Sequence, residues 1–396
     1  MTGAPEGFTA PEAHAAVAAF PRGHQPDRPI LAVTIGDIAG IGPEVTVRAI
    51  TTEAVRAQCL PLVIGHPEIF RRAVALSGLS SSPRLLTGIP RTSGELRNRV
   101  LELEADGFVA CLDPFGEAAL SAPTCRVSGV AGDAAFHYLT QAIQLAQARL
   151  VAGIVTAPLN KEALHLAGHH YPGHTEILAE QCGVVQYAMM LHLSESRIGR
   201  LRQLVHSPDE LACGGDPLEV RHGLSIAHVT LHTSIASVPG LLTTAEIIEK
   251  IELMHGFLQR TGCRRSAIAV AALNPHAGEQ GLFGDEEIRL IAPAVEAMRS
   301  AGMCITGPLP ADTLIRRAFG GEFDGVVAMY HDQGHIPVKL LGFDAAVNIT
   351  LGIPLVRTSP THGTAFDRAW NESTPASPSG MIEAILMAAR LAAPLP

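Results

Sequence analysis

The fold is decided by residues 29–44, which read Pro29-Ile-Leu-Ala-Val-Thr-Ile-Gly36 and then Asp37-Ile-Ala-Gly-Ile-Gly-Pro-Glu44. The first part is a short apolar run that ends in glycine, the pattern of a buried β-strand. A glycine-rich turn follows, and Pro43 stands at the first position of a helix, where the N–H that proline lacks would have no partner anyway. This stretch predicts a strand, a tight turn and a helix that continues over 45–57.

The same alternation of strand and helix continues along the chain. Apolar runs of strand length recur at 60–64, 153–156, 188–193, 225–231, 266–273 and 325–330, and helical patterns separate several of them, as at 134–151, 244–258 and 286–300. Strands that are apolar throughout are buried on both faces, and their alternation with helices is typical of a mostly parallel sheet. We therefore predict the α/β fold class. Because 396 residues exceed the usual size of one core, we expect two domains.

Composition excludes several classes of protein. With 47% hydrophobic and 17% charged residues the chain is globular and core-rich, and its net charge of −9 argues against binding to nucleic acid. No apolar run approaches the ~18 residues that a membrane helix needs. The seven cysteines are widely spaced, as expected for free thiols in the reducing cytoplasm. Residues 1–28 lack the pattern of a signal peptide and predict a flexible tail.

Three of the 18 histidines share one position relative to the predicted strands: His232, His276 and His331 each lie at, or just past, the carboxyl end of an apolar run. In parallel α/β sheets this edge is where ligands bind. Three imidazoles that converge there could hold one divalent transition metal and leave positions open for a substrate. Zinc is the first choice, with cobalt, manganese or magnesium as alternatives. The other interpretation is that each is an ordinary, partly buried histidine, which we favour for His228 and His335.

A second group of residues is basic. Only three of the 29 lysine and arginine residues are lysines, and two of these lysines lie in glycine-, proline- and apolar-rich segments, where a merely solvated charge fits poorly. The helix that begins after Gly173 offers N–H groups and a dipole that favour an anion. We expect a pocket for a phosphate or carboxylate. Its candidate residues are Lys161, His174, Thr175, Lys339, Asn348 and Arg357.

Two acidic residues and the glycine-rich turn do not by themselves identify a catalytic role or a cofactor site. Asp312 and Asp332 could each cap a helix or orient a substrate hydroxyl or amine. The spacing of Gly36, Gly40 and Gly42 is G-x3-G-x-G-P, which does not match the G-x-G-x-x-G dinucleotide fingerprint. Motifs alone therefore do not predict NAD.

Eight segments, in order over about 30–370, resemble the 4-hydroxythreonine-4-phosphate dehydrogenase family of vitamin B6 (pyridoxine) biosynthesis. They are TIGDIAGIGPE (34–44), APLNK (157–161), GHTE (173–176), LNPHAGE (273–279), GPLPADT (307–313), MYHDQG (329–334), VNITLG (347–352) and RTS with HGTA (357–365). The resemblance implies a fold like that of isocitrate and isopropylmalate dehydrogenases, with two α/β domains and a cleft between them. We expect one domain at 29–155 plus 302–396 and the other at 156–301.

The resemblance also implies roles for individual residues. His232, His276 and His331 fall on the family's metal ligands, one of them donated across the interface of an obligate homodimer. Substrate contacts fall on His174, Thr175, Lys339, Asn348 and Arg357, and the family's acidic positions on Asp312 and Asp332. Lys161 is a weaker candidate for proton transfer or a cofactor contact. The implied cofactors are NAD, whose contacts stay unassigned, and a divalent metal.

The implied reaction is the oxidation of a phosphorylated hydroxy acid, such as 4-phosphooxy-threonine or 4-phospho-threonate, followed by loss of CO2. The sequence departs from the family at Ile38, where proline is usual, at an insertion over 195–222, and at Arg368–Ser373. The segment His335–Lys339 is closer to the branch that acts on phosphorylated threonate or erythronate, whose distant relatives oxidise aromatic cis-dihydrodiols. Intact GHTE favours a phosphorylated substrate. A dihydrodiol dehydrogenase and a metal-dependent hydrolase or aldolase are the alternatives.

Overall fold

The structure is a computed structural model, and it describes residues 28–79, 82–205 and 223–393. Nearly all of the expected N-terminal tail and most of the 195–222 insertion lie outside the described residues. Within the described part of the chain no helix is long and apolar enough to cross a membrane. The expected cytoplasmic location stays a prediction.

One sheet runs through both halves of the molecule in the order β3-β4-β2-β1-β5-β12-β11-β6-β7-β10-β8-β9. Its strands are β1 (Ile30–Thr34), β2 (Leu60–Ile64), β3 (Ser82–Leu85), β4 (Phe108–Leu112), β5 (Gly153–Thr156), β6 (Ala188–Leu193), β7 (Leu224–His228), β8 (Ile268–Ala271), β9 (Ile305–Leu309), β10 (Gly325–Ala328), β11 (Val347–Leu351) and β12 (Arg357–Pro360). The predicted α/β fold class is confirmed.

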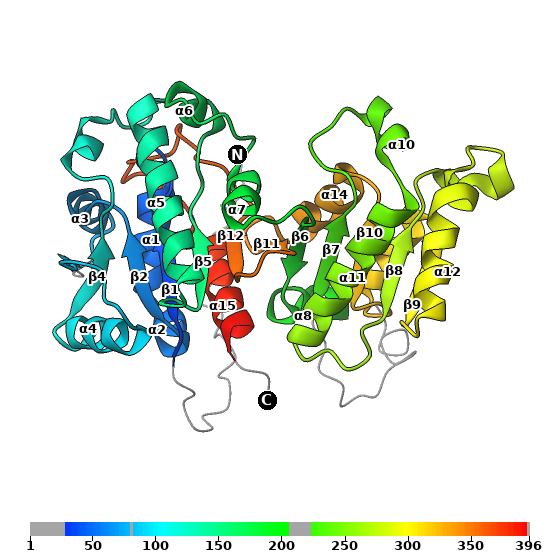
Figure 1. The fold of residues 1–396 in the computed structure, drawn as a ribbon, viewed down its shortest axis with the longest axis horizontal. Coiled ribbons are helices and arrows are strands. Elements are labelled where there is room, and N and C mark those ends of the chain that lie inside the picture. Colours follow the sequence, from blue (N-terminus) through cyan, green and yellow to red (C-terminus); the bar gives the residue numbers. More distant parts are fainter. Residues whose placement is uncertain (1–27, 80–81, 206–222, 394–396) are drawn as a thin grey trace, which may run out of the picture.

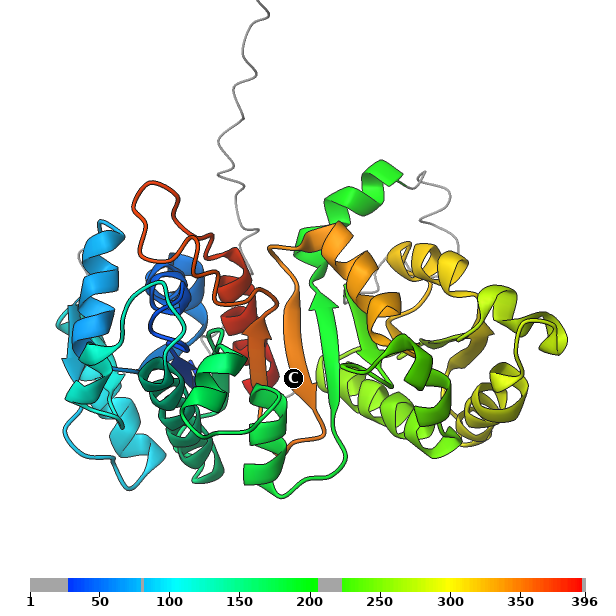
Figure 2. The same cartoon turned by 90° about the horizontal axis from the view of Figure 1, so that it is seen from above.

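Helices cover both faces of this sheet (Figures 1 and 2). They are α1 (Gly42–Ile50), α2 (Glu53–Gln58), α3 (Pro67–Leu76), α4 (Ser93–Ala105), α5 (Gly129–Gln147), α6 (Lys161–Leu166), α7 (His174–Cys182), α8 (Glu195–Val205), α10 (Val238–Leu241), α11 (Thr244–Arg260), α12 (Ala292–Ser300), α13 (Ala311–Phe319), α14 (His331–Gly342) and α15 (Ser379–Ala392). Short turns of other helix types are η1 (Glu117–Ser121), η2 (Ile235–Ser237), η3 (Pro275–Gly281) and η4 (Glu287–Ile291). The apolar strands are buried on both faces, as the sequence predicted.

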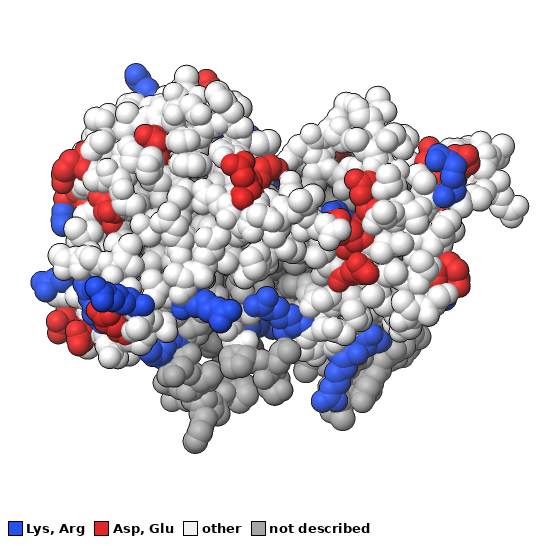
Figure 3. All heavy atoms as spheres, viewed as in Figure 1, with Lys and Arg blue, Asp and Glu red and all other residues white. Residues whose placement is uncertain are grey.

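The strand directions divide the sheet into two parallel halves. In the first half β1, β2, β4, β3, β5 and β12 run parallel, and in the second β7, β10, β8 and β9 do so. Between them, β11 pairs antiparallel with both β12 and β6, and β6 pairs antiparallel with β7. The predicted mostly parallel sheet is confirmed, with antiparallel pairing confined to the joint. Figure 3 shows a notch between the two halves at the upper edge.

The segment after residue 301 does not follow the predicted domain division. β9 pairs with β8, and β10 lies between β7 and β8, so both strands complete the second half rather than the first. The physical reason is that the apolar β10 is buried on both faces, and a central position between two strands satisfies its backbone as well. The chain returns to the first half with β12 and α15. The predicted limit at residue 155 is not followed either, because α6 and α7 pack on α5 of the first half.

Helix α5 packs so closely on α6 that only glycine fits at the contact. A Cβ on Gly132 would lie 2.1 Å from the carbonyl oxygen of Ala163, whereas one on Gly256, in α11, would meet nothing within 4 Å. The α5–α6 contact matters for the site because α6 begins at Lys161.

We expect Gly132→Ala to lower the free energy of unfolding by about 1–3 kcal/mol, because the backbone of α6 must shift to admit the methyl group. The matched change Gly256→Ala should raise it by roughly 0.5–1 kcal/mol, since alanine is the better helix former in open space. Urea denaturation of both variants measures this. Equal effects of the two substitutions would contradict the described packing.

Candidate active site

Three loops meet at the carboxyl edge of the first half. The loop after β1 is tied to the loop after β5 by the N–H of Asp37, which donates to the carbonyl of Pro158 at 2.9 Å. It is tied to the segment after β12 by the N–H of Ile41, which donates to Thr364 at 2.9 Å. Gly36 has a φ of +66°, and a Cβ there would lie 2.3 Å from the Pro158 oxygen, so this turn requires glycine. The turn predicted from residues 36–42 is thus held against the loops that follow β5 and β12.

The basic residues of the first half follow β5. Asn160 caps α6 by accepting the N–H of Ala163 at 2.8 Å, and Lys161 is the exposed first residue of that helix. Helix α7 begins at His174 and Thr175, and no side chain caps it at Gly173. Among the described residues, no side chain accepts the first N–H groups of α7, and this arrangement suits an anion.

Glu176 is a residue to which the sequence interpretation gave no role. Its negative charge raises the pKa of His232, in the second half, against the larger effects of lost solvent and of the Lys161 cation, which lower it. It also acts on Arg357: burial lowers the pKa of this guanidinium to about 10, and Glu176 opposes that change. The carboxylate of Glu176 therefore lies near groups from both halves. The sequence feature that could have identified Glu176 as a site residue is its position in the GHTE segment (173–176).

Histidines of the second half form a group at the carboxyl ends of β7 and β10. The rings of His232 and His331 have centroids 6.0 Å apart, and His331 stacks on His335 at 3.6 Å. His228, rather than His232, ends β7, and burial lowers its pKa to about 3, while burial lowers that of His335 to about 4. These two histidines are neutral, as expected for packing residues. Neutral imidazole is also the form that binds metal.

Asp332 orients the metal candidate on α14. Its Oδ1 lies 2.6 Å from Nδ1 of His331, which leaves Nε2 of that ring for a ligand. Carboxylates in this position fix the tautomer and orientation of a ligating histidine. Asp312 is different: it is exposed on α13, its Oδ1 accepts the N–H of Thr313 at 2.8 Å, and no contact given for the described residues links it to the histidines. Its predicted role stays a prediction.

His276 lies apart from the other two metal candidates within one chain, and the described residues contain no cluster of three metal-binding side chains. Its side chain is 67% exposed, and residues 276–280 all have a positive φ, which is unfavourable for non-glycine residues. Buried Glu287 holds this turn by accepting the N–H groups of Leu273 and Asn274, both at 2.8 Å. Such a strained, well-anchored turn is typical of functional positions.

Arg357 is buried at the centre of the sheet. It is 2% exposed, and it donates to the hydroxyls of Thr156 at 2.8 Å and Thr350 at 3.1 Å. Its Nε and the Oδ1 of neighbouring Asn348 have no hydrogen-bond partner within the described residues. Burial and the Arg357 charge lower the pKa of His174 well below its usual value. The predicted residues His174, Asn348 and Arg357 thus share one region, while Lys339 is exposed on α14 near His335.

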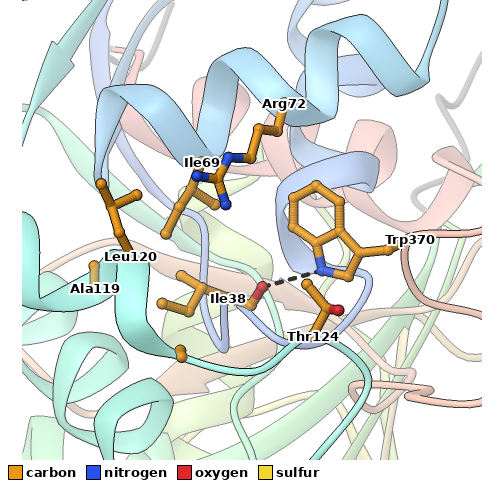
Figure 4. Close-up of a pocket in the computed structure, with 8 residues that line it drawn as sticks. Ile38, Ile69, Arg72, Ala119, Leu120, Thr124 and Trp370 are labelled. Carbon is orange, nitrogen blue, oxygen red and sulfur yellow. Dashed lines mark hydrogen bonds between the residues drawn. The ribbon is translucent and has the colours of Figure 1, made fainter.

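Two departures from the family pattern contact each other (Figure 4). The indole N–H of Trp370 donates to the carbonyl of Ile38 at 3.1 Å, and both residues line a small hollow beside α3. The backbone N–H of Trp370 also donates to the buried Glu44 carboxylate. Ile38 and Trp370, the two positions that the sequence analysis interprets as departures, therefore contact each other beside the loop after β1.

Comparison with known proteins gives consistent results. Residues 57–388 match the family described as pyridoxal phosphate biosynthetic protein PdxA. A D-threonate 4-phosphate dehydrogenase from Cupriavidus necator is 43% identical over 365 residues, covering 92% of this chain and 97% of that protein. The crystal structure of 4-hydroxythreonine-4-phosphate dehydrogenase from Klebsiella pneumoniae is 39% identical and covers 92% of this chain and 100% of that one, with a TM-score of 0.72. A terephthalate 1,2-cis-dihydrodiol dehydrogenase from Burkholderia xenovorans LB400 is 26% identical and covers 91% and 98%, with a TM-score of 0.58.

Asp37 gives a pH-dependent prediction. It is fully buried, its Oδ1 accepts the N–H of Ala39 at 2.9 Å, and its Oδ2 has no partner among the described residues. Burial raises its pKa from 3.8 to about 6 against that hydrogen bond. The folded state therefore holds the proton more tightly, and the stability contributed by the neutral form is lost as the pH rises through about 4 to 6.

We expect Asp37→Asn to gain stability relative to the parent as the pH rises from about 4 to 8, by on the order of 2–3 kcal/mol. Thermal unfolding at several pH values measures this difference. The exposed Asp106 is the control, and Asp106→Asn should show no such trend. A difference between Asp37→Asn and the parent that is constant with pH would show that Asp37 does not ionise in this range.

Proposed function

This chain belongs to the family of the pyridoxal phosphate biosynthetic protein PdxA, and from that premise we propose that it oxidises D-threonate 4-phosphate or 4-hydroxythreonine 4-phosphate with NAD and a divalent metal. The family predicted from the eight motifs is confirmed, and so is the prediction that the chain is a dehydrogenase. The observation that carries the proposal is the buried Arg357 cation beside the open amino end of α7, next to the histidine group of the second half.

The histidines fit a divalent transition metal by their chemistry. His232 and His331 supply imidazole nitrogens from one chain, with Asp332 to orient His331. We propose that His276 of a second copy completes the site in a homodimer. Its side chain is 67% exposed on a turn that Glu287 anchors, and the described residues of one chain contain no cluster of three metal-binding side chains. Zinc is the preferred ion on imidazole affinity, and cobalt or manganese would suit the same donors.

The phosphate fits the first half. The N–H groups that open α7, His174 and Thr175 can donate to phosphate oxygens. We propose that Lys339, exposed on α14 of the second half, supplies a further charge. Arg357 has its guanidinium fixed by two threonine hydroxyls, so it needs little reorganisation to complement an anion. Binding energy from this end of the substrate is then available to orient the reacting carbon.

The proposed reaction transfers a hydride from the carbon of a secondary alcohol to NAD and releases the proton of its hydroxyl to water. When bound, the metal supplies a Lewis acid and NAD supplies the hydride acceptor. The product is a β-keto acid, so its bond to CO2 can break and leave the electron pair on an enolate. Lys161 lies near His232, and we propose that its ammonium gives a proton to that enolate. Glu176 balances the positive charge around the site.

The alternative substrate, an aromatic cis-dihydrodiol carboxylate, is less favoured. A buried arginine beside an uncapped helix start matches a phosphate better than the planar ring of a dihydrodiol. The chain is also less identical in sequence to the dihydrodiol dehydrogenase, at 26%, than to the D-threonate 4-phosphate dehydrogenase, at 43%.

The phosphate assignment predicts a selective effect of Arg357→Gln. For the phosphorylated substrate kcat/KM should fall by about two to three powers of ten, because a charge-assisted bond to a dianion is lost. For an analogue without phosphate the loss should be much smaller, and production of reduced nicotinamide followed by absorbance measures both. Exposed Lys339→Gln should show the same selectivity without loss of thermal stability. If kcat/KM fell equally for the phosphorylated and the unphosphorylated substrate in both variants, the assignment of Arg357 and Lys339 to phosphate binding would be wrong.

The shared metal site predicts complementation between inactive variants. His276→Ala and His331→Ala should each lose bound metal, measured by elemental analysis, whereas exposed His170→Ala should keep it. After the two inactive variants are mixed and allowed to exchange subunits, about one quarter of the parent activity should return, since about half the dimers are hybrids with one intact site. Parental metal content in His276→Ala, or no recovery on mixing, would contradict a shared site.

A further inference from the structure

A second hollow lies on the edge of the sheet opposite the candidate active site. Its volume is about 500 Å3, and it opens where β1, β5 and β12 begin, whereas the candidate active site uses the carboxyl ends of strands. The segment Pro354–Val356, which joins β11 to β12, forms one wall. These two strands carry the candidate substrate-binding residues Asn348 and Arg357. The hollow therefore contacts the end of the β11–β12 hairpin opposite the candidate active site.

Three arginines line this hollow. Arg97 comes from α4, Arg149 follows the end of α5, and Arg260 ends α11. The described residues that line the hollow include no aspartate or glutamate. Figure 3 shows lysine and arginine side chains in a row along the lower edge of this face, where α5 and α11 end in Figure 1. The hollow is therefore positively charged although the chain as a whole is acidic.

The amino end of α4 adds to this charge. Ser93 and Gly94 line the hollow and begin this helix, which extends to Ala105. Thr92 accepts the N–H of Glu95 at 3.2 Å, and the Glu95 carboxylate accepts the N–H of Arg91 at 3.2 Å. Within the described residues, no side chain accepts the N–H of Ser93 or Gly94. Free N–H groups and the positive end of a helix dipole both favour an anion. They point to the same ligand chemistry as the arginines do.

Arg149 has an unfavourable backbone conformation for an arginine. Its φ is 56°, and the chain turns there through the N–H of Leu150, which donates to Leu145 at 2.9 Å. Glycine is the usual residue at such a helix end, and Gly183 takes it at the end of α7. No hydrogen bond or ion pair of the Arg149 side chain is found within the described residues. An unpaired charge at a position that favours glycine suggests a ligand.

We propose that this hollow binds a small organic molecule with two or more linked phosphate groups, of the nucleoside diphosphate class. The phosphates would lie between Arg97, Arg149 and Arg260, and the amino end of α4. The apolar side of the hollow, formed by Ile30, Leu150 and Leu355 among others, would contact the rest of the molecule. Because Arg260 belongs to the second half and the other two arginines to the first, the ligand would bridge the halves behind the active site.

Titration calorimetry on the full-length protein with ADP, pyrophosphate and inorganic phosphate tests this. With NAD held at saturation, ADP should bind, pyrophosphate should bind more weakly, and inorganic phosphate should bind weakest, since only linked phosphates reach several arginines. Arg260→Gln should weaken ADP at least tenfold. Arg299→Gln, which removes the same charge from exposed α12, should leave ADP binding unchanged.

Arg149→Gly separates binding from folding. It should raise the melting temperature, because glycine relieves the positive φ, and at the same time weaken ADP at least tenfold. A structural role for Arg149 would instead lower the melting temperature. The proposal is overturned if ADP fails to bind at millimolar concentration, if NAD or Lys339→Gln abolishes its binding, or if Arg149→Gly and Arg299→Gln bind ADP equally.

Discussion

The joint between the halves of the sheet depends on the antiparallel strands β11 and β6. Their backbone hydrogen bonds connect two parallel sets of strands whose helices and loops otherwise belong to separate lobes. A hydrogen-bonded joint fixes the register, so residues from distant parts of the chain keep constant positions. Thr350 on β11 and Arg357 on β12 meet across this joint, and Thr156 on β5 completes the contact. The candidate active site is built on this rigid centre.

Arg357 places a buried positive charge next to the joint between the two halves. An arginine hidden from water is costly unless its charge is balanced, and within the described residues its hydrogen bonds go to neutral hydroxyls. Its pKa of about 10 leaves it charged near neutral pH. A phosphorylated substrate would supply the missing negative charge at the uncapped start of α7. Glu176 offsets part of this charge without a direct ion pair to Arg357 among the described residues, so the fixed guanidinium still favours the proposed substrate, as in a preorganised site.

Two local features show how sequence changes act together in space. Ile38 and Trp370 depart from the family pattern far apart in the sequence, yet the indole of one donates to the backbone of the other. Glu287 likewise lies beyond the LNPHAGE segment and still holds its left-handed turn. Neither link has a periodic signature, since side chain to backbone contacts of this kind depend on the approach of two loops.

Burial and periodicity are local properties, so the α/β class, the early strand–turn–helix unit and the edge of the sheet at which the histidines lie could be predicted from the sequence. The sequence did not show that β9 and β10 join the second half, or that Glu176 acts on groups of both halves. Strand order depends on which apolar faces are left to be covered once the whole chain has folded. The electrostatic partners of a residue depend on that order, so they become visible once the strands are placed in three dimensions.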